Sequence, residues 1–159
     1  MITYRIGIIA DLDQSSYKSE SKNTWRSYYK KGYLSYNEKK NSIAISFDEG
    51  QPMELVNHYA LNGRGMELSE LVTFNGKLLT FDDRTGFVLE LINGKVIPWL
   101  LLMDGDGNSV KGFKSEWATV KDEVLYVGSM GKEWTTSTGE FQNFDPMYVK
   151  AITTSGNVS

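Results

Sequence analysis

Two Asn-Gly pairs, each between short apolar runs, restrict the fold of this chain more than any other feature of its sequence. They are Asn75-Gly76 and Asn93-Gly94. A two-residue hairpin turn needs positive φ angles at both central residues, and asparagine followed by glycine adopts them at low energetic cost. The pattern therefore predicts two consecutive β-hairpins and an antiparallel sheet. The four predicted strands are residues 71–74, 77–81, 87–92 and 95–101.

The rest of the chain shows the same succession of short apolar runs and polar turns. Further strands are predicted at residues 4–10, 25–36, 42–47, 117–120, 124–128 and 148–153. One short helix is expected at residues 54–61, with His58 on its surface. We therefore predict an all-β chain, with residues 1–159 forming one domain.

An internal repeat favours a β-propeller. Residues 70–79 and 117–126 share their apolar positions and turns at an offset of 47, which makes Ser69 equivalent to Glu116. Units of about 40 to 50 residues with four short strands are typical of propeller blades. At that spacing the chain supplies about three and a half blades, fewer than a closed propeller has. An antiparallel sandwich is the alternative.

Composition excludes several classes of protein and site. The net charge of −3 argues against a nucleic-acid binder, which would usually carry a basic stripe. The absence of cysteine excludes disulfides and thiol nucleophiles, and a single histidine excludes multi-histidine metal sites. The longest apolar run, residues 96–103, is too short to cross a membrane.

Two glycine-containing segments partly match ligand-binding motifs. Residues 128–132 contain a Gly-Lys pair, but no serine or threonine follows it, so the segment does not fit a phosphate-binding loop. Residues 104–108 begin like a calcium loop, but Ser109 and Ser115 occupy the positions that need glycine and glutamate. An acidic turn is the preferred interpretation of the second segment.

Acidic residues at the ends of predicted strands are the remaining chemical signal. They are Asp11, Asp13, Glu67, Glu70, Asp82, Asp83 and Glu116. Singly, each can be a turn former, but as a set they favour Ca²⁺, which prefers six to eight oxygen ligands. In a propeller, equivalent positions of successive blades surround one axis, so Ser69 and Glu116 would each offer oxygen to an axial ion.

Arg64 and Arg84 lie beside these acids. Each arginine can order a loop through a carboxylate pair, or it can bind phosphate through its planar set of donors. Acids, a metal ion and arginine together are the groups used in phosphoryl transfer to water.

Several motifs follow one another along the whole chain: IADLD (9–13), GRGMELSEL (63–71), FNGKL and FDDRTG (74–86), DGDG (104–107), KGFKSEWA (111–118) and GKEWTT (131–136). Together they resemble those of the soluble calcium-activated nucleotidases, an apyrase family. The resemblance implies a five-bladed β-propeller that hydrolyses nucleoside di- and triphosphates with Ca²⁺. Since family members are roughly twice as long, it also implies an incomplete fragment of about three blades, without the C-terminal ones and with little activity of its own.

The resemblance also implies roles for individual residues. Ser69 and Glu116 would bind a central Ca²⁺, and Glu70, at a position where the family has an acid beside the serine, would contribute to the metal site through its backbone. Asp11 and Asp83 would hold a second, nucleotide-bound Ca²⁺ or orient the attacking water. Arg64 and Arg84 would contact phosphates, and Glu67 and Asp13 would also belong to the substrate-binding residues. Trp25 and Trp134 are candidates for nearby packing or for contacts with the base.

The expected partner is a nucleoside di- or triphosphate, such as UDP, GDP, ADP or ATP, and a homodimer is considered. The expected location is outside the cell or in the ER/Golgi lumen, with a signal or anchor upstream of this segment. The alternative function is a catalytically silent propeller segment that binds calcium or a protein partner.

Overall fold

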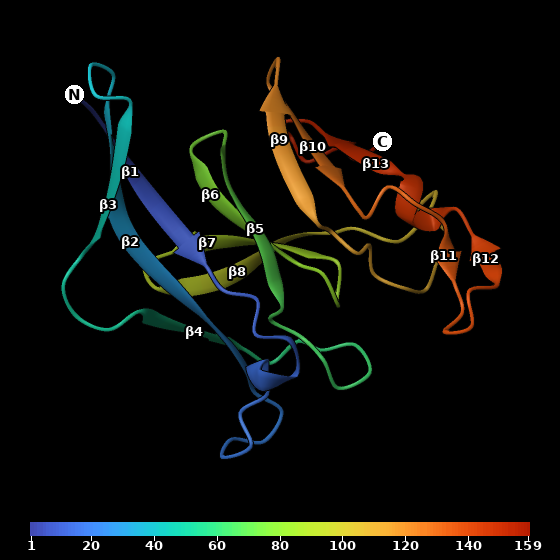
Figure 1. Cartoon of the computed structure of the whole chain (residues 1–159). Helices are drawn as coiled ribbons and strands as arrows, with labels where there is room; N and C mark the ends of the chain where they lie inside the picture. Colours follow the sequence, from blue (N-terminus) through green and yellow to red (C-terminus); the bar gives the residue numbers. More distant parts are fainter.

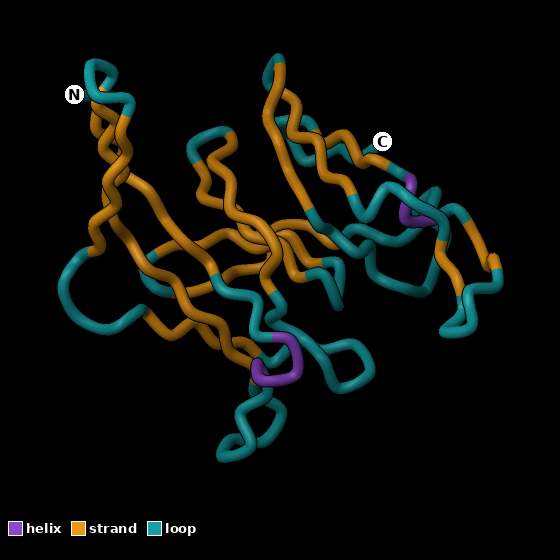
Figure 2. The backbone as a smooth tube through the Cα atoms, viewed as in Figure 1, coloured by secondary structure: helices purple, strands orange, loops and turns teal.

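In the computed structural model, which describes all 159 residues, the chain consists of antiparallel β-strands joined by short loops (Figures 1 and 2). The strands are β1 (Ile2–Ile9), β2 (Trp25–Asn37), β3 (Ser42–Phe47), β4 (Met53–Asn57), β5 (Leu68–Phe74), β6 (Lys77–Asp82), β7 (Phe87–Ile92), β8 (Lys95–Leu101), β9 (Trp117–Lys121), β10 (Val124–Gly128), β11 (Trp134–Thr135), β12 (Phe141–Asn143) and β13 (Val149–Ile152). Two short 3₁₀ helices, η1 (Asp13–Ser16) and η2 (Asp145–Met147), complete the set. The all-β prediction is therefore confirmed. No helix is long and apolar enough to span a bilayer.

The two Asn-Gly turns organise the middle sheet, whose strand order is β5-β6-β7-β8. Asn75 and Gly76 have φ angles of 46° and 76°, and Asn93 and Gly94 have 51° and 73°. These positive values are those that the tight hairpin turn requires. Both predicted hairpins are confirmed, and the sheet is a simple meander of neighbouring strands.

The first sheet is built around β2, which is 13 residues long. Strand β1 pairs with residues 29–36 of β2, β3 pairs with residues 32–37, and β4 pairs with residues 25–29. Strands β4 and β3 thus pair one after the other along the same edge of β2, and β1 pairs along its other edge. Strand β3 lies at the edge of this sheet, and all six of its residues are exposed.

The prediction of a short helix at residues 54–61 is wrong. Residues 53–57 form β4, and His58 follows in an exposed loop, where its Nδ1 lies 2.9 Å from the carbonyl oxygen of Asn23. Within β4, Leu55 and Asn57 are buried while their neighbours are exposed, which is the alternation of a half-buried strand. Pairing with the first half of β2 determines this structure.

The third sheet has the strand order β13-β10-β9, and β11 pairs with β12 in a separate ribbon. Strand β5 contacts both β1 and β9, so the middle sheet lies between the other two (Figure 1). None of the sheets closes on itself. The five-bladed propeller stays a prediction, as does the sandwich that was weighed against it.

Two apolar clusters hold the three sheets together. Side chains from the two faces of the middle sheet enter different clusters, as Val88 and Leu89 do in β7. Leu89 packs with Trp25 and Leu55 of the first sheet, and Val88 packs with Leu125 of the third. The middle sheet is therefore covered on both faces. This packed core also supports the loops that connect its strands.

Gly86 is the last residue of the tight connection between β6 and β7, and its replacement tests how closely this loop is packed. Gly86 has φ of 81°, and a Cβ there would lie 2.3 Å from the Leu102 carbonyl oxygen. Gly86→Ala is expected to lower the free energy of unfolding by more than about 2 kcal/mol, because the strained φ and the overlap act together. Gly76→Ala, at φ of 76° with open space around it, should lower it by only about 1–2 kcal/mol. Denaturant titration of both variants measures this, and equal losses would contradict it.

Candidate functional site

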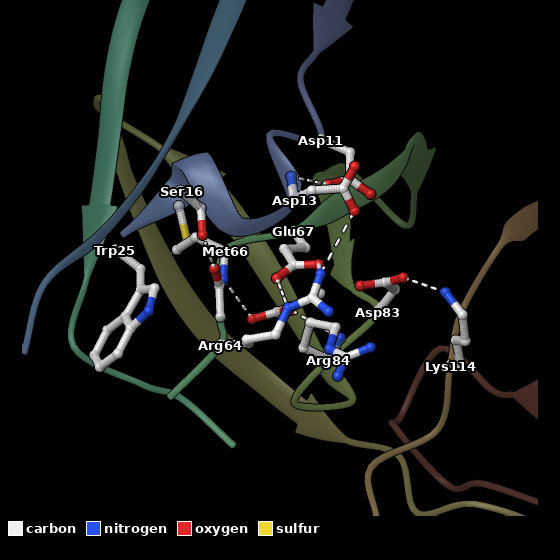
Figure 3. A network of polar contacts seen from close by, with 12 residues as sticks. Asp11, Asp13, Ser16, Trp25, Arg64, Met66, Glu67, Asp83, Arg84 and Lys114 are labelled. Carbon is white, nitrogen blue, oxygen red and sulfur yellow. Dashed lines mark hydrogen bonds and ion pairs between the residues drawn. The ribbon is translucent and has the colours of Figure 1, made fainter. Parts of the chain in front are cut away.

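The candidate site lies at one end of the sheets, where four chain segments meet. They are the loop and η1 after β1, the loop before β5, the connection between β6 and β7, and the loop before β9. Figure 3 shows acids and cations from all four segments pointing toward one another. The strand ends therefore bring together residues that are far apart in the sequence, such as Asp11 and Lys114.

Three carboxylates form the acidic centre of the site. Oxygen atoms of Asp11, Asp13 and Glu67 lie within 4.8 Å of one another. Asp13 has a positive φ of 48°, and its N–H donates to Oδ1 of Asp11 at 2.8 Å, which fixes the turn that presents both acids. Partial burial of the carboxyl raises the pKa of Asp11, and the charges of Asp83 and Asp13 act in the same direction. A group of this kind is stabilised by a cation.

Glu67 is the buried member of this group and is paired with Arg64. Arg64 donates from Nε to Oε1 at 2.7 Å and from Nη2 to Oε2 at 2.6 Å, and its Nη2 also lies 3.5 Å from Oδ1 of Asp13. Burial nevertheless raises the pKa of Glu67 above its ordinary value. The loop-ordering ion pair considered for Arg64 is therefore present, and it forms one wall of the site.

The neighbouring acids Asp82 and Asp83 have different environments. Asp82 is fully buried and accepts hydrogen bonds from the backbone N–H groups of Met66 at 2.8 Å and Arg84 at 3.0 Å. Burial raises the pKa of Asp82. Asp83 is also buried, but its Oδ1 has no hydrogen-bond partner. Asp82 thus shapes the loop, whereas Asp83 presents an unpaired oxygen toward the side of Glu67 (Figure 3).

Lys114 holds the other oxygen of Asp83. Its ammonium group donates to Oδ2 of Asp83 and lies 2.6 Å from Oε1 of Glu116. Burial acts to lower the pKa of Lys114, but its bonds to Asp83 and Glu116 outweigh that effect and raise the pKa. Sequence reasoning did not assign Lys114 a role, although the residue lies within the KGFKSEWA motif. It remains charged and fixes the direction of the Asp83 carboxylate.

Arg84 is the cation of the site without a bound partner. Its backbone N–H is held by Asp82, but its guanidinium group makes no hydrogen bond or ion pair with the protein. It lies beside Arg64 and near Glu67 (Figure 3). A half-buried guanidinium in this state can bind an anion bidentately.

Ser69 and Glu70 lie at an irregularity of β5. The register between β5 and β6 shifts between Leu68 and Leu71, as in a β-bulge, a feature that often redirects side chains near functional sites. The Ser69 hydroxyl donates to the carbonyl oxygen of Ser115 at 2.6 Å. The carboxylate of Glu70 accepts from the N–H of Leu71 at 2.8 Å.

The repeat-based equivalence of Ser69 and Glu116 corresponds to a real proximity. Ser115, which the Ser69 hydroxyl contacts, directly precedes Glu116, and β5 contacts β9. The Glu116 carboxylate itself is paired with Lys114. Hydroxyl, carbonyl and carboxylate oxygens are thus present together, and this set suits a hard cation such as Ca²⁺.

The two candidate tryptophans have different positions. Trp25 is buried near Arg64, and its Nε1 donates to the carbonyl oxygen of Gly63 at 3.1 Å (Figure 3). Trp134 lies on β11, where the Lys111 ammonium is 4.4 Å from its ring centroid. Strand β11 is far from η1 in the fold (Figure 1). Of the two, Trp25 belongs with the site.

Comparison with known proteins identifies the group to which these residues belong. A sequence model described as apyrase matches residues 12–159. The chain belongs to the apyrase family. It is 51% identical to an apyrase of Cimex lectularius over 158 residues and 51% identical to soluble calcium-activated nucleotidase 1 of Rattus norvegicus over 157 residues. These matches cover 99% of this chain but only 43% and 38% of the two relatives, so the chain spans about two fifths of their length.

A third apyrase-family relative, apyrase apy-1 of Caenorhabditis elegans, is 44% identical over 155 residues, which are 98% of this chain and 43% of that protein. The resemblance noted in the motifs is confirmed by these matches.

The charges of the site in this apyrase-family chain do not balance. Its carboxylates outnumber its cations, and one buried carboxylate oxygen, Oδ1 of Asp83, is unpaired. A divalent cation would reduce this excess of negative charge and give the unpaired oxygen a partner, so the residues present fit Ca²⁺. The carboxylates are those of Asp11, Asp13, Glu67, Asp82, Asp83 and Glu116, and the cations are Arg64, Arg84 and Lys114.

Proposed function

We propose that this chain forms part of a Ca²⁺-dependent hydrolase that releases phosphate from nucleoside di- and triphosphates. The observation that carries the proposal is the group of three carboxylates beside the unpaired oxygen of Asp83 and the unpaired guanidinium of Arg84. Oxygen ligands for a hard cation and a free phosphate-binding donor lie in one site. The names of the relatives, apyrase and calcium-activated nucleotidase, support the same chemistry.

Each residue then has a physical role. Bound Ca²⁺ would supply positive charge that orients and neutralises phosphate oxygens. Asp11 or Asp83 positions the attacking water and accepts its proton, and Lys114 holds Asp83 in place. Arg84 stabilises the negative charge that develops on the transferred phosphoryl group. The ion pair of Arg64 and Glu67 orders the loop before β5, in which both residues lie. Asp13 adds to the negative charge that attracts Ca²⁺.

We also propose a second, structural Ca²⁺ at Ser69 and Glu116. The support is the contact of the Ser69 hydroxyl with Ser115 and the chemistry of the oxygen atoms near it. The succession of three sheets along the chain supports a propeller of the calcium-activated nucleotidase type, and the resemblance of the motifs supports residence in the secretory pathway.

The first experiment measures phosphate release from UDP, GDP, ADP and AMP with Ca²⁺, with Mg²⁺ and with a chelator, using the longest natural form of the protein. The expected result is Ca²⁺-dependent release from the diphosphates and none from AMP. Thermal stabilisation by Ca²⁺ without release from any nucleotide would instead support the silent calcium-binding alternative.

Asp11→Asn is expected to lower kcat by about 10²- to 10⁴-fold, because the amide does not accept the proton from water and binds the nucleotide-bound ion more weakly than a carboxylate. The rise in Tm on adding Ca²⁺ should persist, since Ser69 and Glu116 are untouched. Asp122→Asn, in the turn between β9 and β10 with φ of 50°, is the matched control and should behave as wild type. Unchanged hydrolysis by Asp11→Asn would remove Asp11 from the mechanism.

A further inference from the structure

A pocket of about 280 Å³ adjoins the candidate site on the side of η1. Arg64 and Glu67 line part of it, and Gln14, Tyr17 and Trp25 line another part. The ion pair of Arg64 and Glu67 is therefore shared between the pocket and the acidic centre. A molecule that fills the pocket would reach the phosphate-binding side of the site at the same time.

The aromatic wall of the pocket is fixed and partly open to solvent. The ring of Tyr17 lies 5.7 Å from that of Trp25, and Tyr17 is 46% exposed. Trp25 is buried, its Nε1 is bound to Gly63, and its backbone pairs with that of Tyr17 in an isolated bridge. Tyr17 thus presents a ring surface that a rigid neighbour supports, and an aromatic ring of this kind can stack against a nucleobase.

Gln14 supplies a polar edge next to this ring. Its side chain is exposed and makes no hydrogen bond with the protein. The carboxamide can both donate and accept, as the hydrogen-bonding edge of a base requires. Gln14 follows Asp13 directly in η1, so this short helix carries an acid of the site and a wall of the pocket together.

We propose that this pocket binds the base of the nucleotide, with Tyr17 as the stacking surface and Gln14 at the edge of the base. This inference rests on the proposed nucleotide hydrolysis and adds the part of the site that distinguishes a nucleotide from inorganic polyphosphate. Because every base has a π-face that can stack on an aromatic ring, we expect the pocket to accept different bases.

A second pocket near the site provides the comparison. It has a volume of about 190 Å³ and is lined mainly by apolar side chains, including Tyr59, Phe87 and Met103. Tyr59 is also 46% exposed and also packs on an aromatic ring, that of Phe87 at 5.0 Å. None of the acids of the site lines this second pocket. Tyr59 is therefore a matched control for Tyr17.

The test compares substrates with and without a base, in the longest natural form of the protein with Ca²⁺ present. Tyr17→Ala should raise KM for UDP and ADP by about 5- to 150-fold, the range expected for loss of one stacking contact. KM for tripolyphosphate should stay within about 2-fold of the wild-type value, because the residues proposed to bind phosphate are unchanged. Tyr17→Phe, which keeps the ring, and Tyr59→Ala should both resemble wild type.

An equal rise in KM for nucleotides and tripolyphosphate would overturn the inference, and so would unchanged KM values in Tyr17→Ala. If wild type hydrolyses neither class of substrate, the proposed function fails, and calorimetric binding of AMP and UMP then decides the inference. Binding by wild type that weakens at least 5-fold in Tyr17→Ala but not in Tyr59→Ala supports the pocket. Absence of binding by wild type, or equal binding by all three proteins, overturns it.

Discussion

Asp83→Asn is expected to lower kcat for nucleoside diphosphates by at least about 100-fold. Asp83 is buried, Lys114 holds one of its oxygens, and the other is unpaired inside the site. An asparagine fills the same space but carries no charge, so it binds Ca²⁺ more weakly and does not accept a proton from water. Phosphate release under saturating nucleotide and Ca²⁺ measures the loss.

Two neighbouring substitutions separate chemistry from folding. Lys114 retains Glu116 as a partner in Asp83→Asn, so the free energy of unfolding should change by less than about 1 kcal/mol. Asp82→Asn should instead reduce stability, because Asp82 accepts the backbone N–H groups of Met66 and Arg84 in a buried loop. Asp122→Asn should alter neither quantity. Wild-type kcat in Asp83→Asn would exclude this residue from the reaction.

Phe81→Ala is expected to lower the free energy of unfolding by about 3–5 kcal/mol. Phe81 is fully buried in β6 and belongs to the cluster that joins the middle sheet to the third sheet. Removing its ring leaves a cavity between two sheets that are held in place by other contacts, so the void does not collapse completely. Denaturant unfolding followed by tryptophan fluorescence measures the change.

The control for Phe81→Ala is Phe141→Ala, because Phe141 is a phenylalanine of β12 with 58% exposure. It should lose less than about 1 kcal/mol. Phe81 directly precedes Asp82 and Asp83, so Phe81→Ala should also weaken Ca²⁺-induced stabilisation. A loss below about 1 kcal/mol in Phe81→Ala would show that the two sheets are not joined by this cluster.

The hairpins could be predicted because their determinants are local. Asn75-Gly76 and Asn93-Gly94 specify the turn by themselves, and the strands on either side pair across it. Strand β4 could not be predicted in the same way. It pairs with the beginning of β2, more than 20 residues earlier, and the preference of residues 54–61 for a helix was overridden by that long-range pairing.

The sequence predicts which kinds of residue belong to the candidate site, but it does not predict their arrangement. The sequence placed acids and arginines at strand ends, but it could not show that Asp82 is used for loop structure while Asp83 keeps a free oxygen. Lys114 was missed because a lysine in a loop has no periodic signal, and its partner Asp83 is 31 residues away. The sequence also does not show that Arg64 is paired with Glu67 while the guanidinium group of Arg84 is unpaired.

The exposed edge strand β3 has a consequence for the solubility of the chain. Its sequence, Ser-Ile-Ala-Ile-Ser-Phe, carries no charge and no proline, and its outer backbone groups are available to a strand of another molecule. Such a segment can begin intermolecular β-aggregation. Lys39 and Lys40 precede the strand, and Asp48 and Glu49 follow it. These four charges act as gatekeepers, and they oppose the stacking of identical strands in register, because that stacking would place like charges next to one another.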